Sequence, residues 1–331
     1  MRFLKYVLVL VWISVAPVQA QRAQDELTAA AQWSQTATEV QMGQLALFDL
    51  VDLFDEVFMA WDAGEIGDAE AESRLVALRA QLDAARRGVI AQAEALPPPP
   101  RFRTLRAIQP AYQTMYDSIG DGVALTDTFV DAIGNVYETV QQGGDYDETQ
   151  LALIVFDSGD AFIRQQQSLF RAVSLQLPGD SPRGSELRAG VAGYDGLLAL
   201  NNANRQITVD GSFTNAGDEI TALRTAVETI RSEVRSGLDR LRTTRDTLRM
   251  LRSQGREARQ MADLGLEVFS TYEETFDNHL GIAEALSRAA DAMERGSPMV
   301  DLDIETTLIE FERLEMANAT LQSARMARIS Q

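Results

Sequence analysis

The sequence has no cysteine, a single histidine and almost no lysine. Among its 331 residues, His279 is the only histidine and Lys5 is the only lysine. Zinc–thiolate sites, iron–sulfur clusters, covalently attached haem and thiol catalysis all need cysteine, so the sequence excludes them. A metal site built from several histidines is excluded as well, and a Ser-His-Asp arrangement would have to use His279.

Familiar nucleotide-binding and metalloprotease motifs are also missing, since the sequence holds no P-loop, no G-x-G-x-x-G after a strand and no H-E-x-x-H. Carboxylates are abundant, but no pair stands out as a catalytic acid and base, so we expect no enzyme and no cofactor; carboxylate-based catalysis is the alternative. Acidic clusters near residues 65–72, 145–148 and 301–305 are better explained as acidic residues that stabilise the positive ends of helix dipoles. Their spacing does not match a calcium-binding loop.

The chain carries a formal net charge of −19. An acidic surface repels nucleic acid and anionic lipid headgroups, so we expect neither as a partner. The same charge favours a basic protein, a divalent cation or a cationic small molecule.

The first twenty residues have the pattern of a secretory signal peptide. Arg2 and Lys5 precede an apolar run over 6–13, and Val18-Gln19-Ala20 supplies small residues at a cleavage site. The run is shorter than the roughly 20 residues that span a bilayer. We therefore predict a signal peptide over 1–20, a mature chain starting near Gln21 with no membrane span, and a periplasmic location, with an extracellular one as the alternative.

Apolar residues repeat at helical spacing nearly throughout, and no stretch alternates as a strand would. Phe54, Phe58 and Trp61 step by four and three, for example, and Pro97–Pro100 interrupt the pattern because no helix interior holds four prolines. The sequence predicts an all-α fold of long helices with heptad-like seams.

The chain divides into two similar halves at a stretch rich in proline, glycine and serine. We predict a first helical bundle over 21–176, a linker over 177–186 and a second helical bundle over 187–331. Residues 76–82 align with 221–227, which suggests an internal duplication. The predicted architecture is two tandem antiparallel four-helix-bundle-like units.

Two polar residues and one aromatic group are the candidate site residues. His279 lies on an apolar seam and Thr126 is its counterpart in the first half. Either residue could fix helix register or contact a ligand, and His279 could also respond to pH. Phe54, Phe58 and Trp61 are typical of a packed core, with a ligand pocket between helices as the alternative.

These observations predict an exported, non-enzymatic helical scaffold that binds another envelope or extracellular protein through its helical surfaces. The heptad-like seams would also suit a homodimer. The alternative is a periplasmic four-helix-bundle sensor that binds a ligand near the aromatic group or near His279.

Overall fold

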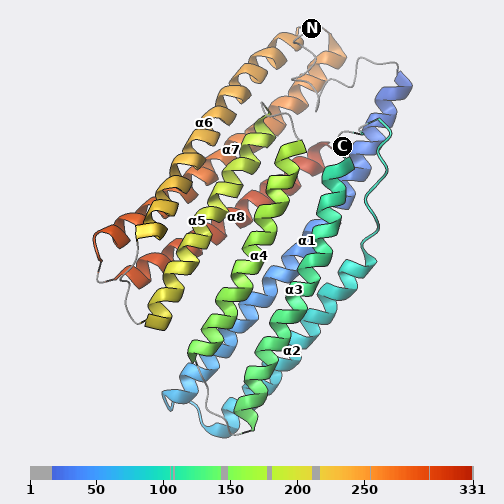
Figure 1. The fold of residues 1–331 in the computed structure, drawn as a ribbon. Helices are drawn as coiled ribbons and strands as arrows, with labels where there is room; N and C mark the ends of the chain where they lie inside the picture. The colour runs from blue at the N-terminus through green and yellow to red at the C-terminus, as the bar shows by residue number, and fades with distance from the viewer. Residues whose placement is uncertain are drawn as a thin grey trace. The chain divides into compact units, whose positions relative to one another are not determined.

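The chain is all-helical, as the sequence predicts. The computed structural model describes residues 17–104, 106, 109–142, 148–176, 181–210, 217–253, 255–297 and 299–329, so most of the predicted signal peptide and residues 177–180 of the predicted linker lie outside this part. The described residues contain no strand. They form the helices α1 (Pro17–Asp62), α2 (Asp68–Ala95), α3 (Gln109–Gln141), α4 (Glu148–Gln176), α5 (Pro182–Asp210), α6 (Gly217–Leu251), α7 (Arg256–Glu294) and α8 (Val300–Ile329) (Figure 1).

Among these described helices, none combines the length and apolar character that crossing a membrane requires.

Contacts divide the described residues into two compact units. Unit 1 takes those within 1–33, 99–114 and 166–331, and unit 2 takes those within 34–98 and 115–165. The predicted domain boundaries and the duplication stay predictions. Residues 182–186, which the sequence analysis placed in a linker, belong to α5.

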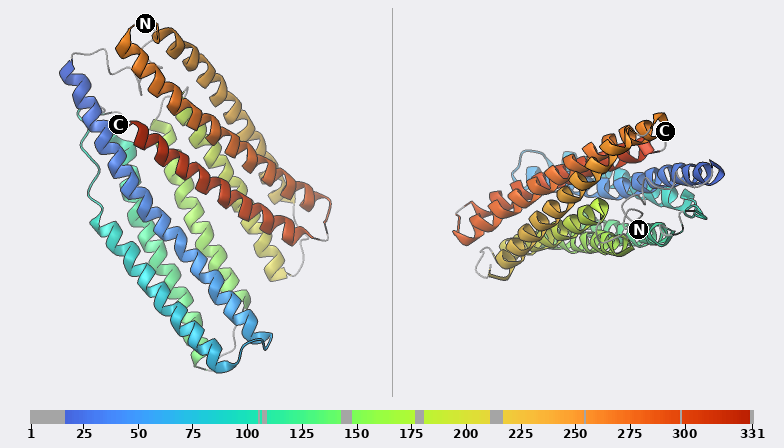
Figure 2. Two further views of the ribbon diagram at one scale, coloured as in Figure 1. Left: turned by 180° about the vertical axis from the view of Figure 1, so that it is seen from behind. Right: turned by 90° about the horizontal axis from the view of Figure 1, so that it is seen from above.

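In unit 1, α5, α6, α7 and α8 pack side by side, and Figure 2 shows the same arrangement from behind and from above. Their facing sides form one apolar core. The apolar seam of α7 on which His279 lies is part of it: Phe276, Ala283, Leu286 and Ala290 are fully buried. A long amphipathic helix gains most of its stability from burying such a face.

In unit 2, the core comes from α1, α2 and α3, with Ile154 and Val155 of α4 packed against it. Buried apolar residues from the first three helices are Leu47, Phe54, Val57, Phe58, Leu75, Leu78, Leu82, Val89, Phe129, Val130, Ile133 and Tyr137.

Local sequence explains where several helices begin and end. α2 ends at Ala95 because Pro97–Pro100 follow, and Asp68 and Glu70 complement the helix dipole in its first turn. α7 ends in a Schellman motif: Gly296 has a φ of 59°, its N–H donates to the Met293 carbonyl at 3.1 Å, and the Ser297 N–H donates to the Ala292 carbonyl at 3.0 Å.

Candidate functional site

A group of polar and ionisable side chains lies in the interior of unit 1, where apolar residues would be expected. We call it the polar core cluster. It comes from α5, α7 and α8 and comprises Arg183, Glu186, Tyr194, Thr271, Thr275, Asn278, His279, Glu315, Asn318 and Arg325.

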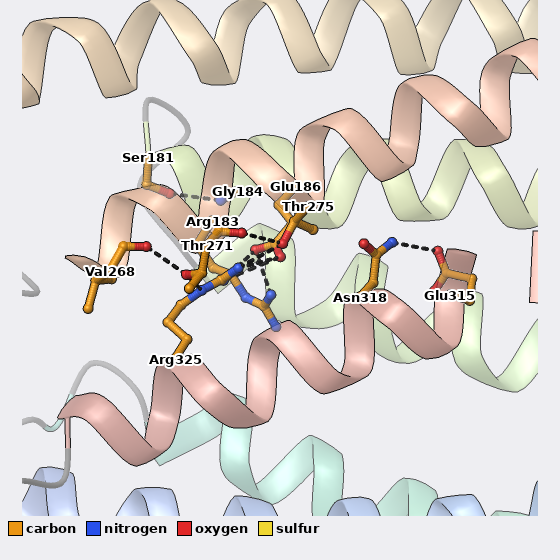
Figure 3. Close-up of polar contacts among 10 residues, drawn as sticks. All are labelled: Ser181, Arg183, Gly184, Glu186, Val268, Thr271, Thr275, Glu315, Asn318 and Arg325. Carbon is orange, nitrogen blue, oxygen red and sulfur yellow. Dashed lines mark hydrogen bonds and ion pairs between the residues drawn. The ribbon is translucent and has the colours of Figure 1, made fainter. Parts of the chain in front are cut away.

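Glu186 reaches this interior because α5 begins at Pro182, four residues before it. The Ser181 hydroxyl caps the helix by accepting a hydrogen bond from the Gly184 N–H at 3.0 Å, and Pro182 occupies the first helical position, where its fixed φ suits the helix. A stretch of linker-like composition is therefore a helix start. Glu186 lies in its second turn and faces α7 and α8 (Figure 3).

Arg325, near the end of α8, is the main partner of Glu186. The side chains of Arg325 and Glu186 are 4% and 6% exposed, and their closest N–O distance is 3.0 Å. The Arg325 guanidinium also donates to the hydroxyls of Thr271 and Thr275, each at 3.0 Å, and stacks on the Tyr272 ring at 3.5 Å. One side chain thus ties α8 to both α5 and α7.

Both threonine hydroxyls accept a hydrogen bond from Arg325, and each also donates its own proton to a backbone carbonyl. Thr271 donates to the Val268 carbonyl at 2.6 Å, and Thr275 donates to the Thr271 carbonyl at 2.8 Å. Such full satisfaction matters because an unpaired polar group in a dry core costs about 1–3 kcal/mol.

The pKa of Glu186 is lowered from 4.5 to about 2. Burial alone would raise it, but the charges and hydrogen bonds of Arg183 and Arg325 together outweigh burial. Arg183 lies three residues before Glu186 on α5 and approaches it to 2.6 Å. The carboxylate is therefore ionised throughout the physiological range.

His279 lies on α7, one turn after Thr275, and is only 3% exposed. Its Nδ1 is buried and has no hydrogen-bond partner among the described residues. Burial lowers its pKa from 6.5 to about 4; the nearby Glu186 charge opposes this shift and the Arg183 charge adds to it. The imidazole is therefore neutral at pH 7.

A second carboxyl, Glu315 on α8, has the opposite behaviour to Glu186. Burial and the charge of Glu186 raise its pKa from 4.5 to about 7, although hydrogen bonds from Asn318 and Tyr194 favour its ionised form. The Asn318 amide donates to Glu315 at 3.2 Å and accepts from the Asn278 amide at 2.9 Å. Figure 3 shows the Glu315–Asn318 pair farther along α8, about two turns before Arg325.

Within the described part of the chain, no three His, Asp or Glu side chains are placed to hold a metal ion. The cluster is best described as an interhelical network of charges and hydrogen bonds.

Thr126, the other predicted polar position, is buried in unit 2 and donates to the Gly122 carbonyl at 2.9 Å. It lines a cavity of about 10 Å³ with Gln44, Leu47, Leu125, Phe129, Ser158 and Phe162. That volume is enough for about one water molecule.

Two glutamine amides lie over Gly122 beside this cavity. A Cβ on Gly122 would stand 2.6 Å from Gln44 Nε2 and 3.0 Å from Gln165 Nε2, so a larger residue there would require the Gln44 side chain to shift. Gln165 Nε2 donates to the Ser118 carbonyl, whereas Gln165 Oε1 and both amide atoms of Gln44 are buried without a partner among the described residues.

The predicted aromatic group is part of the unit 2 core. Phe54 and Phe58 are buried there, and the partly buried Trp61 packs against it, with its indole N–H donating to Asp68 at 3.0 Å. These three residues do not line the cavity next to Thr126.

An unusual surface feature lies on α8. Leu302, Ile309 and Met316 are spaced seven residues apart and are 51%, 60% and 50% exposed. We call these three residues the α8 apolar row. The opposite side of α8 packs in the unit 1 core through Ile304, Phe311 and Leu314.

Sequence reasoning identified His279 but missed most of the polar core cluster. Glu186 was assigned to a linker because of its neighbours. Asn318 and Arg325 follow the buried Phe311 at seven-residue spacing, so extending a heptad-like spacing along this helix would have found both.

Comparisons of this chain with protein-family models, with curated proteins and with solved structures found no significant match.

Proposed function

We propose that the chain is an exported, non-enzymatic helical scaffold that binds another envelope or extracellular protein through the α8 apolar row. The observation that carries the proposal is the exposure of Leu302, Ile309 and Met316 at a constant spacing. Residues seven apart lie on nearly the same side of a helix, and the row extends over about 21 Å at 1.5 Å per residue. Apolar side chains gathered on one exposed face are typical of a protein interface.

The buried contacts of α8 support this proposal because they fix the orientation of the helix. Arg325 binds Glu186, Thr271 and Thr275 on one side of α8, and Phe311 packs in the core. A row held on a rigid element loses little entropy on binding.

We further propose that α1–α4 and α5–α8 form two tandem four-helix units that arose by duplication.

Site-specific photo-crosslinking in the producing cell tests the proposal. A photoreactive amino acid at position 309 should give a discrete adduct, while the same amino acid at Thr229, on the exposed side of α6, should not. The proposal is wrong if position 309 gives no more adduct than position 229.

Export belongs to the same proposal and has its own test. The amino-terminal sequence of the protein isolated from the cell envelope should begin near Gln21. A chain that keeps Met1 and stays in the cytoplasm would contradict export.

A ligand-binding sensor is the second candidate, and the two glutamines of unit 2 favour it. Gln44 lines the small cavity together with Thr126, and both of its amide atoms and Gln165 Oε1 have no partner among the described residues. Because the cavity holds about one water molecule, a larger ligand would bind only if these glutamine side chains moved aside. A thermal-shift screen of small polar molecules should then find a compound that stabilises the wild type and not Gln44→Met. If no compound distinguishes the two proteins, the sensor function is excluded.

A further inference from the structure

We infer that the partner surface that covers the α8 apolar row carries arginine or lysine beside its apolar residues. This inference rests on the proposed function and adds the chemistry of the partner. Its basis is the distribution of charge on the exposed face of α8.

One side of the row is acidic. At about 100° of rotation per residue, Asp301, Glu305 and Glu312 project roughly 40° to 80° to the same side of the line through Ile309. All three are exposed, and no ion pair involves Glu305 or Glu312 in the part of the chain that the structure describes. Asp301 also complements the dipole in the first turn of α8, but Glu305 and Glu312 lie too far along the helix for that role.

The other side of the row is nearly uncharged. Met299 and Thr306 lie there, with Arg313 as the single charge, and all three are exposed. A partner would therefore meet apolar side chains in the middle and carboxylates along one edge. Charges at the edge of an interface mainly speed association and exclude wrong partners, and they are sensitive to salt.

A second copy of this chain fits that surface poorly. If the row occupies the a positions of a heptad, Glu305 and Glu312 occupy the d positions. In a parallel pair of α8 helices, each of these carboxylates would face the same carboxylate of the other copy. In an antiparallel pair, the carboxylates of one copy would face the α8 apolar row of the other. The net charge of −19 adds a general repulsion between copies.

Charge reversal combined with the crosslinker at position 309 tests the inference. In Glu305→Arg/Glu312→Arg the adduct should fall about tenfold or more, because the partner's basic side chains then face arginine. In Glu305→Gln/Glu312→Gln the fall should be smaller. The control Glu274→Arg/Glu284→Arg makes the same change in net charge on the exposed side of α7 and should leave the adduct within about twofold.

The outcomes separate this inference from the proposed function. An adduct that forms equally in the charge-reversed protein and its control overturns the inference and leaves the scaffold function standing. An adduct with twice the mass of the chain shows that the partner is a second copy, which also overturns it. If the wild-type chain gives no adduct at position 309, the scaffold function itself fails.

Discussion

At the scale of single residues, the most informative side chains are the buried His279 and the partly buried Glu315, whose pKa values shift in opposite directions. His279 binds a proton less readily in the folded chain than in the unfolded chain, and Glu315 binds one more readily. A pKa difference between the two states makes stability depend on pH.

We predict that His279→Leu changes the pH dependence of stability. The folded pKa of His279 is about 4 against 6.5 unfolded, so the wild type loses stability as pH falls from 6.5 to 4, by about 3 kcal/mol. His279→Leu should lose this dependence and, at pH 7, should unfold within about 1 kcal/mol of the wild type, since the leucine fills similar volume. Urea unfolding at several pH values measures both effects.

His279→Ala is the matched variant, because it leaves a cavity and should cost about 2 kcal/mol or more at pH 7. If the free energy of unfolding changes with pH equally in the wild type and in His279→Leu, the pKa of His279 does not differ between the folded and the unfolded chain.

We predict the reverse pattern for Glu315→Gln. The folded pKa of Glu315 is about 7 against 4.5 unfolded, so this carboxyl favours the folded chain at low pH, and the benefit is lost as pH rises from 4.5 to 7. Glu315→Gln should therefore gain stability relative to the wild type above pH 7. The exposed Glu312→Gln serves as the control and should show no such gain in the same urea titrations.

At the scale of helices, buried contacts decide how the elements of unit 1 hold together. We predict that Arg325→Met destabilises the chain by about 1–3 kcal/mol, because Glu186 would lose one of its two arginine partners and keep only Arg183. The double variant Glu186→Leu/Arg325→Met should be more stable than Arg325→Met alone. A double variant worse than the sum of the single changes would contradict this account of the pair.

The exposed Arg313→Met is the control on the same helix and should change stability by less than about 0.5 kcal/mol. Hydrogen exchange should show faster opening of the last turns of α8 in Arg325→Met and unchanged exchange in Arg313→Met.

Close approach of α6 and α7 gives a second prediction at this scale. A Cβ on Gly237 would overlap the fully buried Phe276 ring, whereas a Cβ on the exposed Gly88 of α2 would meet nothing within 4 Å. Gly237→Ala should therefore destabilise by about 1–3 kcal/mol, while Gly88→Ala should stabilise by about 0.5–1 kcal/mol through helix propensity. Equal melting temperatures for the two variants would refute the tight packing at Gly237.

Sequence periodicity predicted the helices well because each long helix must bury one face. The apolar seam on which His279 lies and the break at Pro97–Pro100 both follow from the sequence. The start of α5 could not be predicted, because serine and proline are as common in linkers as at the first positions of helices. Only the hydrogen bond between the Gly184 N–H and the Ser181 hydroxyl shows that Ser181 caps a helix.

At the scale of the whole molecule, the excess of carboxylates is the dominant property. With a net charge of −19, the folded chain brings like charges closer together than the unfolded chain does. We predict that raising NaCl from about 20 to 300 mM increases the melting temperature, because salt screens this repulsion. Glu274→Arg/Glu284→Arg should show a smaller increase, and a melting temperature that falls with salt in the wild type would mean that surface ion pairs outweigh the repulsion.

The sequence by itself determined the helical class, the absence of cysteine chemistry, the acidic surface and the apolar position of His279, because composition and periodicity are local properties. Only the tertiary structure decided that Glu186, Tyr194, Glu315 and Arg325 are brought together, that two glutamine amides share the space over Gly122, and that one apolar row of α8 stays exposed. The reason is physical: burial, and with it the pKa of each group, depends on which helices pack together, and residues as far apart as Glu186 and Arg325 become neighbours only in the fold.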